Sequence, residues 1–172
     1  MTVVLLALRD PDLARRALTA LAEQTGPAVD YRAIVVDATE SVPFARFLRG
    51  VTGDLEVITA PHGGSRFALL RQAGDRAGSD HLAMLDECVE VQPGWLDALR
   101  AAVAGQGAAA GLASALAVDG ARVVDAGYLI HGRAHVALAP LVSDRSHPWL
   151  AATRGVMVAP PLACWFARAA LE

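Results

Sequence analysis

Cysteine is scarce in this sequence. Cys88 and Cys164 are the only two in 172 residues, and they lie far apart in the chain. One pair is too few for a disulfide framework and too few for a structural zinc site. The sequence is therefore not that of a small disulfide-rich secreted domain, and we expect the protein to work in the reducing cytoplasm.

Lysine is absent, and all 15 basic residues are arginine. Together with the alanine-rich composition, this is typical of a GC-rich coding bias, so arginine content alone does not indicate anion binding. The net charge is −3 and the isoelectric point is near 5.9. A surface of this charge does not favour nucleic acid or an anionic membrane, and we expect neither as a partner.

Long hydrophobic runs are missing as well. The apolar N-terminal stretch "TVVLLAL" (2–8) ends at Arg9 and Asp10, so it is too short for a membrane span and lacks the basic start of a signal peptide. The hydrophobic residues, 54% of the chain, are instead spread over short segments. A chain of this length can bury a real core, and we expect residues 1–172 to form a single domain.

What the sequence does contain is a regular alternation of buried strands and helices in its first 107 residues. Apolar, β-branched segments predict strands, and helical spacing of apolar residues between them predicts helices that start at Asp10, Ser41 and Ser65. This order predicts an α/β fold of three layers, a mostly parallel sheet flanked by helices on both faces. The expected central strands are 2–8, 31–39, 55–61 and 81–91, and the expected helices are 10–26, 41–51, 63–78 and 93–107.

The pattern changes after residue 107. Extended pieces at 108–120, 122–132 and 134–142 are separated by glycine turns, and Asp119 followed by Gly120 is typical of a hairpin. The C-terminal segment 156–172 predicts an edge or broken strand, because Pro160 and Pro161 cannot donate to a sheet. We expect a small antiparallel extension near the C-terminus.

Polar residues stand where the predicted parallel strands end, which is where open α/β sheets bind their ligands. Asp37 closes the second strand, although an aspartate there can equally cap the following turn. Arg66 falls in the first turn of a helix, at the positive end of the dipole, where a cation is unfavourable unless an anion lies near. Asp86 closes the fourth strand. We predict that Asp37, Arg66 and Asp86 surround one cleft at this edge.

Four segments, "VVLLALRDPDLARRALTALAEQT", "AIVVDAT", "LDECVEVQPGWLDAL" and "PPLACWFARAALE", follow in an order that resembles the family two glycosyltransferases of GT-A fold. In that family a strand precedes an Asn/Arg-Pro-Asp-Leu helix, and later segments read Val-Val-Asp and Leu-Asp-Asp-Asp-Val-x-Val-x-Pro-Gly-Trp-Leu. The third segment is the most specific part of a resemblance that covers nearly the whole chain. It implies a GT-A-like, Rossmann-like fold and transfer of a hexose, with inversion, from a nucleotide-sugar donor to an acceptor.

The resemblance also implies roles for particular residues. Asp37 matches the acid that binds the nucleotide base or ribose, and Arg66 falls close to a position that holds the base. Asp86 and Cys88 fall on the first and last acids of the family's Asp-x-Asp motif, which holds Mn²⁺ or Mg²⁺. Residues 1–107 would form the nucleotide-binding half and residues 108–172 the acceptor-side half.

The departures from the family concern the metal and the base. Cys88 offers a soft sulfur, which suits hard divalent ions poorly, and strand alternation points Glu87 to the opposite side from Asp86. The family's Glu-Asp segment, which supplies the general base, would lie beyond Glu172, and His147 is the weak candidate that this chain offers in its place.

Two interpretations follow. The first is a compact or truncated glycosyltransferase. The second is a non-catalytic GT-A-like module for binding or scaffolding, which has lost its metal and base residues. In either case we expect the apolar tail "PLACWFARAALE" to pack partly against the sheet, with Trp165 and Phe166 as a candidate surface for self-association or for a partner protein.

Overall fold

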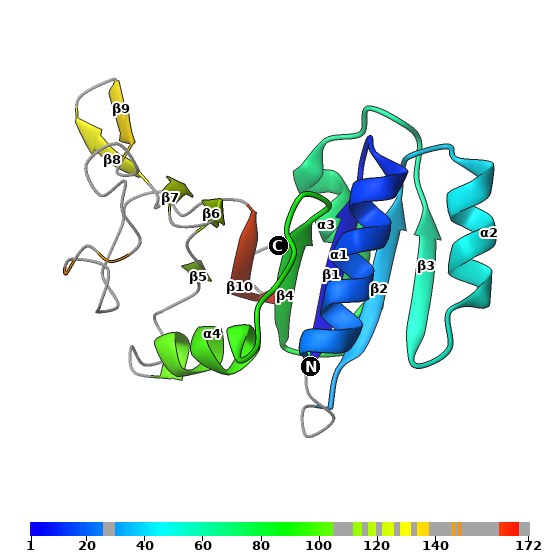
Figure 1. The fold of residues 1–172 in the computed structure, drawn as a ribbon, viewed down its shortest axis with the longest axis horizontal. Helices are drawn as coiled ribbons and strands as arrows, with labels where there is room; N and C mark the ends of the chain where they lie inside the picture. The colour runs from blue at the N-terminus through cyan, green and yellow to red at the C-terminus, as the bar shows by residue number, and fades with distance from the viewer. Residues whose placement is uncertain are drawn as a thin grey trace.

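The computed structural model describes residues 1–25, 30–104, 112–114, 117–119, 122–125, 128–131, 134–137, 146, 148 and 162–168. Over these residues the chain forms an α/β fold, as predicted, with one large sheet between helices (Figure 1). No described helix has the length and apolar character needed to cross a membrane.

The large sheet has six strands in the order β3-β2-β1-β4-β10-β5. The first four in this order run parallel, because β1 pairs in parallel with both β2 and β4, and β2 with β3. Their bounds are β1 (Thr2–Ala7), β2 (Arg32–Asp37), β3 (Leu55–Thr59) and β4 (His81–Asp86). All four predicted parallel strands are therefore confirmed.

The predicted central position holds for three of these strands and is wrong for β3, which is an edge strand. The side chains of β1 and β2 are almost completely buried, as continuous apolar sequence predicts for a strand covered on both faces. In β3, Val57 and Thr59 are exposed, since among the described residues this strand has a neighbour on one side only and its faces are less completely covered. The sequence of β3, with Glu56 in its middle, is correspondingly more polar.

Helices cover both faces of the sheet. They are α1 (Pro11–Gln24), α2 (Val42–Gly50), α3 (Arg66–Arg76) and α4 (Trp95–Ala104). Buried residues of α1, α2 and α4 form one core with alternate residues of the strands, and α3 forms the second core with the remaining ones. Figure 1 shows α1 in front of the sheet and α3 behind it. The molecule therefore has the three predicted layers.

The helix starts follow local sequence signals. The Asp10 carboxylate accepts hydrogen bonds from the backbone N–H groups of Asp12 (2.9 Å) and Leu13 (3.1 Å), and Pro11 occupies the first helical position. Ser41 caps α2 by accepting from the N–H of Phe44 (3.3 Å). Ser65 precedes α3 as predicted, but its side chain makes no cap hydrogen bond. The first N–H groups of α3 are thus not satisfied by their own cap residue.

The antiparallel part was predicted only in outline. Strand β10 (Ala163–Ala167) lies between β4 and β5 (Leu112–Ser114) and runs antiparallel to both. Two short antiparallel pairs complete the described structure: β6 (Ala117–Asp119) with β7 (Arg122–Asp125), and β8 (Tyr128–His131) with β9 (Ala134–Ala137).

The position of β10 corrects the expected partner surface. Trp165 is only 7% exposed and belongs to the core that contains α1 and α4, and Phe166 is half-buried against the opposite core. Trp165 cannot therefore present an exposed aromatic surface, because its strand is an inner strand of the sheet. The remainder of the predicted segment, residues 161 and 169–172, lies outside the described residues.

Candidate functional site

The strand order places a topological switch point between β1 and β4. From β1 the chain moves to β2 and then to β3 on one side, and it returns through α3 to β4 on the other side of β1. Connections that leave in opposite directions open a crevice above the carboxyl ends of the two strands, and ligands of open α/β sheets bind there. Residues 8–10 after β1 and residues 86–88 at the end of β4 form this part of the edge.

Asp86 and Arg66 meet at this point. The Asp86 side chain is 4% exposed, and its Oδ2 atom forms an ion pair with Nη2 of Arg66, the first residue of α3. Apart from this ion pair, Oδ2 has no hydrogen-bond partner among the described residues. Oδ1 accepts a hydrogen bond from the backbone N–H of Cys88 (3.2 Å). The sequence argument was that a cation in this first helical turn is unfavourable unless an acid lies near, and in the structure Asp86 is the acid beside Arg66.

The Glu87 side chain contacts the end of β1 and not Arg66, the partner of Asp86. Its Oε2 atom accepts hydrogen bonds from two successive backbone N–H groups, those of Leu8 (2.5 Å) and Arg9 (2.9 Å). The residue is 7% exposed. A buried carboxylate is stable only where donors satisfy it, and these N–H groups do so. Glu87 therefore joins the two strands that flank the switch point.

The orientation of Glu87 has a different cause from the one expected. Strand alternation was the argument, but β4 ends at Asp86, and the N–H of Val89 bonds to the Asp86 carbonyl (3.0 Å) to close a turn. Residues in a turn do not alternate between faces. The sequence argument missed the contact with β1, which a carboxylate beside the free N–H groups of a strand end could have suggested.

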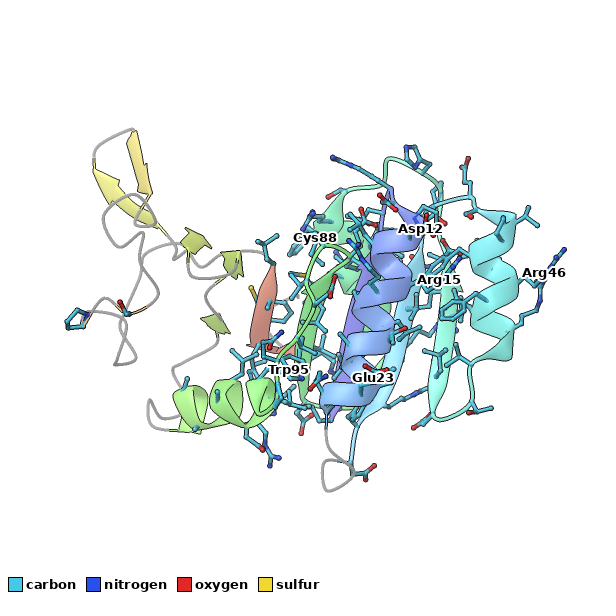
Figure 2. All side chains as sticks on the ribbon, viewed as in Figure 1. Asp12, Arg15, Glu23, Arg46, Cys88 and Trp95 are labelled. Atoms are coloured by element: carbon cyan, nitrogen blue, oxygen red, sulfur yellow. The ribbon has the colours of Figure 1, made fainter. Side chains whose placement is uncertain are left out.

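Cys88 follows in the same turn and is exposed. Partial burial of the thiol, followed by its hydrogen bond to Asp86 and the negative charge of Asp86, raises the pKa of Cys88 to about 11. The thiol is therefore neutral at pH 7. Figure 2 shows Cys88 at the end of the sheet where the parallel strands finish.

Asp37 stabilises the turn after β2. Its Oδ1 atom accepts hydrogen bonds from both the backbone N–H (3.0 Å) and the hydroxyl (2.7 Å) of Thr39. The Thr39 hydroxyl in turn accepts from the N–H of Ser41 (3.2 Å), the cap residue of α2. The turn-capping alternative is thus what the structure shows for this oxygen.

The three predicted site residues do not form one contact cluster. Asp37 aligns with Ala7, and Asp86 aligns with Leu6. Ala7 and Leu6 belong to opposite cores, so the two acids lie at the same edge but alternate to opposite faces of the sheet. The single cleft around all three residues is therefore corrected to an Arg66–Asp86 pair on the α3 face and Asp37 on the other face.

A second loop crosses the same edge beside β2. The backbone N–H of His62 donates to the Glu40 carboxylate (3.4 Å), and the ring Nδ1 of His62 lies 3.2 Å from the Ala38 carbonyl. Glu40 adopts a positive φ of 56°, which is uncommon for a residue with a side chain. His62 and Glu40 were not singled out in the sequence.

His147, the predicted candidate base, lies outside the described residues.

An apolar groove of about 420 Å³ lies elsewhere, between the end of α1, the end of α2 and the starts of β2 and β3. Tyr31 and Leu55 in its lining mark the amino edge of the sheet, and burial raises the pKa of the Tyr31 hydroxyl. The switch-point rule and the charged groups nevertheless favour the carboxyl edge as the ligand site.

The residues at the end of β4 do not fit a Mn²⁺ or Mg²⁺ ion. Such ions take oxygen ligands in a near-octahedral arrangement, but Asp86 is paired with Arg66, Glu87 is bonded to β1 and Cys88 offers a neutral thiol. Within the described ranges, no three His, Cys, Asp or Glu side chains gather in a way that could hold a metal ion. The predicted Asp86–Cys88 metal site is not supported by this donor set.

Comparison with known proteins identifies solved structures that share the fold of this chain. No family model matches this chain. No curated protein matches it either. Among solved structures, residues 1–349 of TarS from S. aureus superimpose with a TM-score of 0.56 at 14% identity, covering 99% of this chain and 48% of that one.

Two further neighbours were crystallised with nucleotide and Mn²⁺. The mannosyltransferase PcManGT from Pyrobaculum calidifontis, with GDP-Man and Mn²⁺, matches with a TM-score of 0.50 at 20% identity over 68% of this chain and 35% of that one. GalNAc-T7, with UDP, GalNAc and Mn²⁺, matches at 0.52 and 13% identity over 62% and 21%. The chain spans less than half the length of each neighbour. It has the fold of GT-A-type glycosyltransferases, as the sequence resemblance implied.

Proposed function

We propose that this chain binds the nucleotide diphosphate of a nucleotide-sugar donor and is the donor-binding part of a glycosyltransferase that transfers a hexose with inversion. The Arg66–Asp86 pair at the switch point of a GT-A-type sheet carries the proposal. Two neighbours with this fold were crystallised with GDP-Man or UDP, which supports a nucleotide as the ligand class.

The two faces of the edge suit different parts of the ligand. The Arg66 side chain is 43% exposed and can reach a phosphate. The second carboxylate oxygen of Asp37 can accept a hydrogen bond from the imide N–H of a base or from a ribose hydroxyl. The two acids stand on the strands that flank β1, so their backbones are about 10 Å apart at the usual strand spacing. A nucleotide diphosphate lying across the end of β1 would span this distance, with Asp86 beneath the phosphate or the sugar.

The two halves of the chain would then bind different substrates of the reaction. We propose that residues 1–107 bind the donor and that residues 108–172 belong to the acceptor side, with β10 joining both halves through its pairing with β4 and β5. This division follows the order of the resembling segments. In this proposal the acceptor is a hydroxyl-bearing molecule.

A non-catalytic binding module is the second candidate. The neutral thiol of Cys88 and the engagement of Asp86 by Arg66 favour it, because both depart from the chemistry of a metal-assisted transferase. The two candidates share the nucleotide site and differ in turnover. They are separated by release of free UDP or GDP from a nucleotide sugar, with and without candidate acceptors.

Calorimetric titration with UDP, GDP and TDP, each with and without Mn²⁺, tests the shared proposal. We expect one of the three to bind, and Asp37→Asn to weaken that binding by about tenfold through loss of a charged acceptor. Asp75→Asn, at an exposed position on α3, is the matched control and should bind like the unchanged protein. Failure of all three nucleotides to bind in both conditions would overturn the proposal.

A further inference from the structure

We propose that Arg66 supplies the positive charge that compensates the donor diphosphate, so that nucleotide binding at this site requires no divalent cation. The inference rests on the proposed function and deepens it. A diphosphate brings two or more negative charges to the carboxyl edge, and some group must balance them. The question is whether a metal ion or a protein side chain occupies that role.

Asp86, which would have to bind the metal ion, already has partners at both carboxylate oxygens. The buried Asp86 carboxylate has Arg66 at Oδ2 and the N–H of Cys88 at Oδ1. A divalent ion binding Asp86 would have to displace the guanidinium or stand beside it, and two cations close together on one carboxylate repel each other. Asp86 therefore acts here as the counter-ion that holds a side-chain cation at the edge.

Neighbouring groups do not provide a second place for the metal. The Glu87 carboxylate is committed to the N–H groups of Leu8 and Arg9, and moving it would leave these groups without their acceptor. Cys88 adds a sulfur that hard ions bind weakly. A metal site at this turn would require both the end of β1 and the Arg66–Asp86 pair to rearrange.

Arg66, by contrast, is placed as a phosphate-binding group. It is the first residue of an 11-residue helix, its side chain is half-exposed, and the Ser65 hydroxyl does not cap the helix. Backbone N–H groups of a helix N-terminus bind phosphate, and a guanidinium can add two parallel hydrogen bonds to the same group. The unfavourable position of a cation at this end of the helix dipole becomes favourable once a phosphate lies between them.

Calorimetry of the whole chain with UDP and GDP, in excess EDTA and in Mn²⁺, tests the inference. We expect the bound nucleotide to show the same affinity in both conditions within about threefold. Arg66→Met should lower that affinity by about tenfold or more, whereas Arg66→Lys, which keeps the charge but not the planar fork, should retain part of it. Arg71→Met, an exposed arginine on the same helix, is the matched control and should change little.

The outcomes separate the two proposals. Binding that occurs only with Mn²⁺ would overturn the inference and leave the proposed function standing. Absence of binding in EDTA and in Mn²⁺ would overturn both. An Arg66→Met protein with unchanged thermal unfolding and unchanged nucleotide affinity would also overturn the inference, because a folded variant without the guanidinium would then bind as well as the original.

Discussion

The Glu87 carboxylate accepts a hydrogen bond from the backbone N–H of Arg9 at 2.9 Å, and through this contact the end of β4 is tied to the end of β1. The same oxygen also accepts from the N–H of Leu8. The two strands are neighbours in the sheet, but beyond Ala7 and Asp86 their ladder has ended. The side chain thus continues the connection where backbone pairing stops.

Removing this acceptor should destabilise the fold. Glu87→Leu keeps the side-chain size but leaves two partly buried N–H groups unpaired, and we expect the free energy of unfolding to fall by about 1–3 kcal/mol. Glu87→Gln keeps an acceptor oxygen and should cost less. Urea denaturation measures both. Glu90→Gln, in an exposed pair with Arg16, should stay within about 0.5 kcal/mol, and an equally small effect for Glu87→Leu would show that the contact is not structural.

The thiol of Cys88 should react slowly at mildly alkaline pH. Its pKa is raised to about 11, so the reactive thiolate forms only as the pH rises toward that value, and the rate should still be rising above pH 9. With a disulfide reagent at pH 8, we expect a rate roughly tenfold below that of free cysteine, since the scarcer thiolate is partly offset by its greater nucleophilicity.

The colour change of the reagent gives this rate directly. Cys164 is buried in the sheet and should not contribute, so Cys88→Ser should remove the reaction of the folded protein. Asp86→Asn removes the neighbouring carboxylate that raises the pKa and should make Cys88 react faster. A rate equal to that of free cysteine in the unchanged protein would contradict the described surroundings of the thiol.

Replacing Cys88 by Asp should create a metal response. The new carboxylate adds an oxygen ligand beside Asp86, so nucleotide affinity in Mn²⁺ should rise by about tenfold, which corresponds to about 1.4 kcal/mol. In EDTA the added negative charge should weaken diphosphate binding instead. Cys88→Ser, which adds no charge, is the control for both conditions. Unchanged nucleotide affinity of Cys88→Asp in Mn²⁺ would show that a second carboxylate is not enough to create a metal site while Arg66 is paired with Asp86.

Local sequence signals were sufficient for the parallel half of the fold. The continuous apolar segment that became β1 and the cap residues Asp10 and Ser41 gave correct elements, because burial on both faces and capping leave direct patterns. The edge position of β3 and the insertion of β10 between β4 and β5 depend on pairing between residues far apart in the chain. No local pattern determines such pairing, and the burial of Trp165 was missed for that reason.

The candidate site was predicted in its residues but not in its geometry. Arg66 was selected because a cation at a helix N-terminus needs an anion, and the structure supplies Asp86. The separation of Asp37 from Asp86 depends on register, and a shift of one residue moves a side chain to the other face. The contact of Glu87 with the end of β1 depends on the residue at which β4 ends. The apolar pattern of the sequence does not identify that residue.

The central claim is that a nucleotide diphosphate binds at the carboxyl edge between β1 and β4. A ¹H–¹⁵N NMR titration of the whole chain with UDP or GDP tests it most directly. The account predicts amide shifts concentrated in Leu8 and Arg9, in residues 86–88, in the first turn of α3 and in the turn at residues 37–39. Shifts confined to the groove at the amino edge, around Tyr31 and Leu55, or no shifts at saturating nucleotide, would contradict it.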